Sequence, residues 1–186
     1  PKSRLYGDAN PAFTGDVTGF KNSETIASAT TGTLTFNSPA TALSNVGSYA
    51  IDGSGLTANF GNYVFVQALG NASALTIDPA TLTYVADPKS RLYGDANPAF
   101  TGDVTGFKNS ETIASATSGT LVFNSTATAL SNVGSYAIDG SGLTANFGNY
   151  VFVQALGNAS ALTIDPATLT YVADPKSRLY GDANPA

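Results

Sequence analysis

The decapeptide SRLYGDANPA lies at residues 3–12 and recurs at residues 90–99 and 177–186. The copies are 87 residues apart, and the residues between them repeat as well. Residues 1–87 and 88–174 differ only at Thr31/Ser118, Thr35/Val122 and Pro39/Thr126. A fixed period of this size is typical of an array of similar structural units. Because the sequence starts and stops at neighbouring phases of the period, we expect it to be a window on a longer array.

The composition favours a folded, extracellular chain. Hydrophobic residues make up 42% of the sequence, which is too high a fraction for a disordered chain. The sequence has no Cys, which excludes disulfides and suits export in an unfolded state. Eight basic and thirteen acidic residues give a net charge of −5, which disfavours binding to nucleic acid. There is no apolar run of about 18 residues, so we expect no membrane insertion in this segment.

The boundary between units is predicted at a proline. Leu75–Ile77 and Leu82–Ala86 both have the alternating, β-branched pattern of strands, and Asp78-Pro79 lies between them. Proline has no N–H group and restricts the residue before it, so it interrupts a strand ladder. We therefore expect a unit lacking its first strand at residues 1–79, a complete unit at 80–166 and the start of a third at 167–186. Few side-chain contacts are expected across the proline junctions.

Strand patterns recur at short spacing in the predicted complete unit. Seven strands are expected, at residues 81–86, 90–93, 99–105, 120–124, 135–139, 150–156 and 159–164. Gly157-Asn158 is typical of a two-residue hairpin turn between the last two. Asn109–Ala116 is predicted to be a short helix with Ser110 as its cap. The pattern indicates an all-β tandem array of small, Ig-like β-sandwich units, with β-grasp-like units as the alternative.

Each unit is long enough to bury a core of its own. Alternation along the strands predicts that the core side chains are Leu82, Tyr84, Leu92, Phe100, Val104, Leu121, Phe123, Tyr136, Ile138, Phe152, Leu162 and Ile164.

The repeated decapeptide has two interpretations. Gly94, Asp95 and Pro98 are residues that shape turns, so the motif is expected to be a fixed turn with a largely buried Tyr93. The alternative is a binding loop with Arg91, Tyr93 and Asp95 at its polar tip. Turn chemistry accounts for every residue of the motif, and the turn is therefore the favoured interpretation.

These residues also carry a family resemblance. The stretch LTIDPATLTYVADPKSRLYGDANPAFTGDVTGFKNSETIAS, followed by VGSYAIDGSGLTANFGNYVF and a closing LTI, resembles the MBG repeat with a YG-containing opening. The resemblance covers the whole period and implies tandem repeats of large bacterial surface or secreted proteins, including filamentous-haemagglutinin-like adhesins. The sequence departs from that pattern in FKNSET, where Ser110 and Glu111 stand in place of an expected Gly-Asp. The resemblance implies no catalytic residues.

The sequence offers little for catalysis or metal binding. It has no His and no Cys, which removes the commonest general base and the thiol nucleophile. Asp52, Asp78 and Asp87 are isolated from one another, whereas a calcium site needs several converging carboxylates. We therefore expect neither an enzyme nor a metal or cofactor site.

The sequence favours a structural role. We expect a stalk or spacer of a large adhesin or surface filament on the bacterial cell surface, with neighbouring units of the same chain as partners. One alternative is a module that binds a glycan or a protein weakly and gains avidity from repetition. Another is a filament subunit that makes lateral contacts with other copies of the chain. The absence of Trp favours the spacer over glycan binding.

Overall fold

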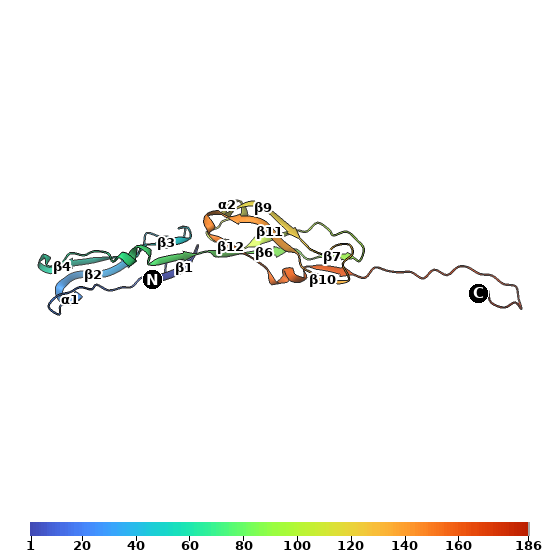
Figure 1. The fold of residues 1–186 in the computed structure, drawn as a ribbon, viewed down its shortest axis with the longest axis horizontal. Helices are drawn as coiled ribbons and strands as arrows, with labels where there is room; N and C mark the ends of the chain where they lie inside the picture. The colour runs from blue at the N-terminus through green and yellow to red at the C-terminus, as the bar shows by residue number, and fades with distance from the viewer. Residues whose placement is uncertain (186) are drawn as a thin grey trace.

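The computed structural model describes residues 1–185 and shows an elongated molecule (Figure 1). Two β-rich units lie end to end, and an extended segment leaves the second unit at the end that faces away from the first. The elements of the first unit are β1 (Lys2–Leu5), α1 (Ile26–Ala29), β2 (Thr30–Asn37), β3 (Gly47–Tyr49), β4 (Asp52–Ala58), the 3-10 helices η1 (Asn59–Gly61) and η2 (Leu69–Ser73), and β5 (Leu75–Asp78).

The second unit contains every counterpart of these elements and three further strands. Its elements are β6 (Ala80–Ala86), β7 (Lys89–Leu92), β8 (Gly102–Thr105), α2 (Ile113–Ala116), β9 (Thr117–Asn124), β10 (Gly134–Tyr136), β11 (Asp139–Ala145), η3 (Asn146–Gly148), β12 (Tyr150–Gln154), η4 (Leu156–Ser160) and β13 (Leu162–Asp165). The prediction of an all-β tandem array with one short helix per unit is confirmed.

Three small sheets build the second unit. In the first, β6 runs parallel to β12 on one side and antiparallel to β8 on the other. In the second, β13 runs parallel to β7 and antiparallel to β10. The third is the antiparallel ribbon of β9 and β11. Each parallel pair joins a strand from the start of the unit to one from its end, which requires a long connection between them.

Tyr84 of β6 packs at the centre of the second unit. Its ring stacks on Phe152 of β12 with a centroid distance of 5.2 Å and meets Phe123 of β9 edge-on at 6.4 Å. Gly140 of β11 lies against the same side chain, since a Cβ at that position would be 2.6 Å from the Tyr84 Cβ. The ribbon therefore packs on the β12-β6-β8 sheet through Tyr84.

The first unit lacks the β12-β6-β8 sheet. The counterpart of Ala80–Ala86 would fall before Pro1, and residues 15–18 and 63–67, the counterparts of β8 and β12, form no strand among the described residues. A strand needs a neighbour for its backbone hydrogen bonds, so losing the central strand removes the whole sheet. The remaining strands pair as β1-β5-β3 and β2-β4.

The extended C-terminal segment also shows that this strand forms only beside its neighbouring strands. Residues 167–173 have the sequence ATLTYVA, identical to that of β6, yet they are exposed and unpaired within the described chain. Local sequence is therefore insufficient to form this strand. The contacts with β12 and β8 decide it.

Pro79 separates two sheets. β5 pairs with β1 and β3, whereas β6, which begins one residue after the proline, pairs with β12 and β8. The chain therefore passes from one sheet to the next in a single residue.

The predicted hairpin at Gly157-Asn158 is wrong. Residues 156–160 form η4, and the strands on either side of it, β12 and β13, belong to different sheets. Asn158 is fully buried, and its side chain binds the backbone of β6. A residue that favours turns is used here for a long-range contact instead.

Most of the predicted core is confirmed. Leu82, Tyr84, Val104, Phe123, Ile138, Leu162 and Ile164 are buried, and Phe100, Leu121, Tyr136 and Phe152 pack against them while partly exposed. Leu92 is the exception, being 47% exposed. It alternates with Arg91, which takes the inward position on β7.

The helix cap was also predicted at the wrong residue. Thr112 caps α2, and it forms a capping box in which its side chain accepts from the Ser115 N–H while the Ser115 hydroxyl accepts from the Thr112 N–H. Ser110 lies outside the helix in a left-handed conformation with φ of 59°. The helix is accordingly shorter than the predicted Asn109–Ala116.

Candidate functional site

The joint between the two units is held by a set of polar contacts between side chains of both units. Here "the joint" means the contact between the end of the first unit that carries the YGD motif and the facing end of the second unit. It comprises Tyr6, Gly7, Asp8, Ala42, Asn45 and Val46 on the first side and Lys108, Asn109, Glu111, Asn149 and Tyr150 on the second.

The carboxylate of Glu111 accepts hydrogen bonds from one tyrosine hydroxyl of each unit. Tyr6 is 3% exposed, and its ring meets the Tyr150 ring edge-on at 5.3 Å. The Tyr6 hydroxyl donates to Glu111 Oε1 at 2.9 Å, and the Tyr150 hydroxyl donates to the other carboxylate oxygen. The backbone N–H of Lys108 donates to the Tyr150 hydroxyl at 2.9 Å. This network fixes Glu111 between the units.

Further polar contacts surround the tyrosine pair. Lys108 Nζ lies 2.9 Å from Asp8 Oδ1, which is the one salt bridge in residues 1–185. Both side chains are partly exposed, so this pair contributes modestly to stability. Asn109 Nδ2 donates to the Ala42 carbonyl at 3.2 Å.

Asn149 links the units through its side-chain amide. Its Nδ2 donates to Asn45 Oδ1 at 2.9 Å, and its Oδ1 accepts from the Val46 N–H at 3.0 Å. Asn149 is 4% exposed, so these bonds lie out of water, where leaving either group unpaired would be costly. The expectation of few side-chain contacts across the junction is therefore wrong.

The close approach of the second unit explains why a glycine follows Tyr6. A Cβ at this position would lie 2.3 Å from the Lys108 Cβ, and the backbone has a φ of 83°. Glycine is thus required both by the turn and by the approach of the second unit. At Gly94, its counterpart in the second unit, a Cβ would meet nothing within 4 Å in the described part of the chain.

The outer ends of the two units carry the counterparts of the residues on the two sides of the joint. Tyr93, the counterpart of Tyr6, is 45% exposed. At the opposite end Tyr63, the counterpart of Tyr150, donates to Glu24, the counterpart of Glu111. A contact between two different faces of a repeated unit is heterologous and can continue without limit. The outer ends of the two units therefore carry the same kinds of side chain as the two sides of the joint.

The order of these features matches one family model. The model described as MBG domain (YGX type) matches residues 1–73 and 82–160. The chain belongs to this family. The search of curated proteins and the search of solved structures found no match. The predicted MBG resemblance is confirmed, and the YG residues that name the type are Tyr6-Gly7 in the joint and Tyr93-Gly94 at the outer end.

The MBG units do not present the predicted binding-loop residues together. Arg91 is buried, with its Nε donating to Asn97 Oδ1 at 2.7 Å and its guanidinium also bound to the Thr128 carbonyl. Tyr93 and Asp95 are exposed. A ligand-binding role for these three residues stays a prediction.

The expectation that Tyr93 is largely buried is wrong. Its counterpart Tyr6 is buried because a second MBG unit covers it. The sequence near Tyr6 and near Tyr93 is the same, so no local pattern could separate them. The second-unit side of the joint does have a recognisable sequence feature, which is a pair of charged residues close together. In a chain with 11% charged residues, Lys108 and Glu111 lie within four positions.

Residues 1–185 contain neither a cluster of potential metal ligands nor a membrane-spanning helix. No three acidic side chains gather into a group suited to a metal ion. The helices in the same range are also too short to span a membrane.

Alkaline pH should weaken the joint. Burial and the hydrogen bond to Glu111 raise the pKa of Tyr150 above its ordinary value of 10.0, and burial raises the pKa of Tyr6 as well. A raised pKa in the folded state gives stability that is present below about pH 10 and lost as pH rises through the higher value.

Urea unfolding at pH 8, 10 and 11.5 would measure this loss. We expect the free energy of unfolding to fall above pH 10 and to fall less steeply in Tyr150→Phe. The control is Tyr171→Phe in the exposed segment, which should follow the wild-type profile. An identical slope in wild type and Tyr150→Phe would contradict the prediction.

Proposed function

We propose that the chain is a spacer segment in the stalk of a large extracellular bacterial adhesin or surface filament, where its units supply length and stiffness. The joint is the observation that carries this proposal. Buried Tyr6 and Asn149 fix the relative position of consecutive units by contacts that a flexible linker would not make.

Repetition extends the argument from one joint to an array. Residues 1–87 and 88–174 are nearly identical, so each joint in a longer array would use the same side chains. Equal joints generate a straight rod or a regular helix. The net negative charge of each unit would also disfavour collapse of the array onto itself. The lack of Cys suits export of the chain in an unfolded state, as a location outside the cell requires.

Small-angle scattering on chains that repeat residues 80–166 four and eight times would test the stalk. Compactness scaling gives an 87-residue unit a radius of gyration of about 12 Å and hence steps of roughly 40 Å between counterpart atoms. We expect the maximum dimension to grow in proportion to the number of units at constant mass per length. Growth with the square root of that number would indicate flexible joints and would favour multivalent ligand binding instead.

A further inference from the structure

One edge of a sheet in the second unit is open. β12 is the outermost strand on one side of the β12-β6-β8 sheet, and within residues 1–185 it pairs with β6 alone. Both strands run along the long axis of the molecule (Figure 1). The edge lies well inside the sequence, and every strand of its sheet is formed by residues 80–154.

Every second residue of β12 directs its backbone groups toward the open edge. The Ala155 N–H donates to the Tyr84 carbonyl at 2.9 Å and continues the ladder between the two strands. Because backbone groups alternate in direction along a strand, those of residues 151 and 153 also point toward β6, and those of residues 150, 152 and 154 point away from it. A row of N–H and C=O groups at an open edge is a template for pairing with another chain.

The other edge strands of the second unit carry features that discourage such pairing. β8 contains Gly102 and Asp103, and β7 contains Lys89 and Arg91. β10 has only three residues, and the β9–β11 ribbon has a register shift at Gly142. Charge, short length and bulges are the devices by which natural sheets protect their edges. β12 has five residues, YVFVQ, without a charge, a glycine or a proline.

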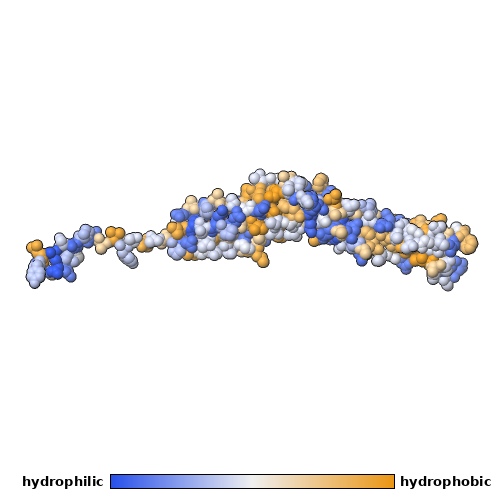
Figure 2. Space-filling model, turned by 180° about the vertical axis from the view of Figure 1, so that it is seen from behind, coloured by the Kyte–Doolittle hydropathy of each residue, from blue (hydrophilic) through white to orange (hydrophobic). Residues whose placement is uncertain are grey.

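Exposed hydrophobic side chains accompany the open edge. Figure 2 shows that hydrophobic side chains reach the surface at several places along the second unit. Val151 and Val153 are 48% and 45% exposed on the outer face of β12. Phe147, before the strand, is 77% exposed, and Leu156, after it, is 97% exposed. Apolar side chains therefore lie on the strand and at both of its ends.

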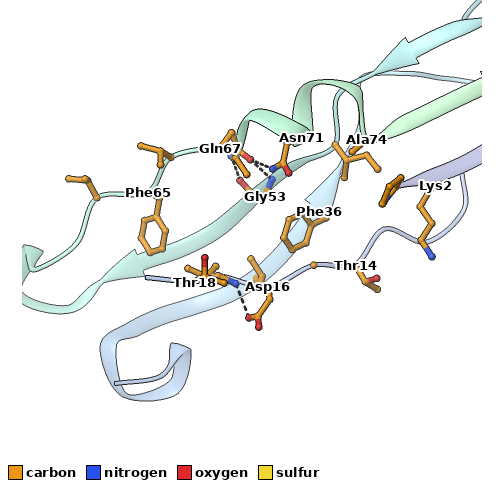
Figure 3. Close-up of a pocket in the computed structure, with 18 residues that line it drawn as sticks. Lys2, Thr14, Asp16, Thr18, Phe36, Gly53, Phe65, Gln67, Asn71 and Ala74 are labelled. Atoms are coloured by element: carbon orange, nitrogen blue, oxygen red, sulfur yellow. Dashed lines mark hydrogen bonds between the residues drawn. The ribbon is translucent and has the colours of Figure 1, made fainter. Parts of the chain in front are cut away.

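β12 is held in place at both ends. The Gln154 amide donates to the Gly140 carbonyl at 2.7 Å and accepts from the Gly140 N–H at 2.9 Å. Gln67 makes the same pair of contacts with Gly53 in the first unit (Figure 3). At the beginning of the strand, the Tyr150 hydroxyl is bound in the joint. Pairing at this edge therefore needs little further ordering of the strand.

We propose that β12 of one copy pairs antiparallel with β12 of a second copy around a twofold axis at Phe152. In this register Tyr150 lies opposite Gln154 of the second copy, so the outward backbone groups meet as hydrogen-bonded pairs. Val151 lies opposite Val153 of the second copy as a non-hydrogen-bonded pair, in which the side chains are closest. The two three-stranded sheets become one, with both cores on the same side of it.

Several features of the edge favour a second copy as the partner. The strand is uncharged, so two identical strands meet without like charges opposite each other. The twofold axis places Phe147 of each copy at the same end of the pair as Leu156 of the other, where exposed apolar surface is available on both. A twofold contact uses the same surface on both copies and needs no second kind of site.

An array would multiply this contact. Residues 63–67 and 150–154 are identical, so each complete unit of a stalk would carry the same edge. Weak contacts between single units would then add along two antiparallel stalks. This consequence rests on the proposed function, whereas the pairing of two copies does not.

Sedimentation velocity of the full chain over a concentration series tests the proposal. The solvent contains about 0.3 M NaCl, which screens the repulsion between copies that each carry a net charge of −5. We expect the wild-type sedimentation coefficient to rise with concentration and to level off at the value of a dimer. Val151→Lys with Val153→Lys should abolish the rise, because it sets like charges opposite each other.

The matched control is Thr81→Lys with Thr105→Lys. It adds the same charge at exposed positions on the same face of the sheet, on β6 and β8, away from the open edge. The control should keep the rise, and urea unfolding checks that both variants remain folded. Wild type that stays monomeric, or equal behaviour of the two variants, would overturn the proposal.

Disulfide trapping tests the register, since the chain has no Cys of its own. Two single variants, Val151→Cys and Val153→Cys, are oxidised separately and as a mixture, with a size tag on one of them. The twofold register sets residues 151 and 153 of different copies about 4.5 Å apart between Cα atoms, within the span of a disulfide. In the separate samples the two thiols lie on diagonal positions roughly 7–8 Å apart, beyond the usual span.

The mixture should therefore yield severalfold more covalent heterodimer than either variant yields of its homodimer. Each variant changes one exposed side chain, so the strand and its sheet are retained. Equal yields of heterodimer and homodimers would indicate nonspecific contact and would exclude the twofold register.

Discussion

Gly7→Val is expected to open the joint, whereas Gly94→Val should leave it closed. Both glycines have a φ near 90°, so each substitution carries the same backbone cost of roughly 1–2 kcal/mol. Only at Gly7 would the new side chain overlap Lys108. Comparison of the two variants therefore distinguishes the effect of losing the contact between units from the effect of backbone strain in the turn.

Distances between two spin labels would report the opening. Thr57 and Thr144 are counterpart positions, both exposed, and a Cys at each carries one label. We expect a narrow distance distribution in the otherwise unchanged chain and in Gly94→Val, and a broad one in Gly7→Val. A narrow distribution in Gly7→Val would show that the joint does not depend on the close approach of Gly7 and Lys108.

Leu82→Ala should destabilise the second unit strongly. Leu82 is fully buried at the centre of β6, and truncating a buried leucine to alanine costs about 2–5 kcal/mol. The chain supplies a matched control in Leu169, which has the same neighbours in sequence but is exposed. Leu169→Ala should change the free energy of unfolding by less than about 0.5 kcal/mol.

Native-state hydrogen exchange is the suitable measurement, because it reports the second unit separately from the first. Similar losses of protection in β6 and β12 for the two variants would contradict the assignment of β6 to the core.

The sequence was informative where the signal is local or periodic. The 87-residue period identified the array, and Pro79 marked the place where the chain changes sheet. Alternation placed Leu82, Tyr84 and Ile138 in the core. These features depend on spacing and on backbone restrictions, which a single sequence carries in full.

The features that were missed depend on distant partners. Asn158 has the sequence signal of a hairpin turn, but its side chain binds Tyr84, which lies 74 residues earlier. The joint was missed for a similar reason. Tyr6 and Tyr93 lie in the same local sequence, and only the presence of a following unit decides which is buried. Residues 80–86 and 167–173 likewise share one sequence and differ in structure.

The two parallel strand pairs determine how a unit would respond to tension. β6 and β7 lie near the start of the unit, and their partners β12 and β13 lie near its end. Pulling the two ends of the chain apart therefore drags each pair in opposite directions along the strand axis. In this shear geometry the hydrogen bonds of a pair share the load, whereas a pair pulled from one end opens one bond at a time. A chain of such units would resist extension by the same strands that complete its fold.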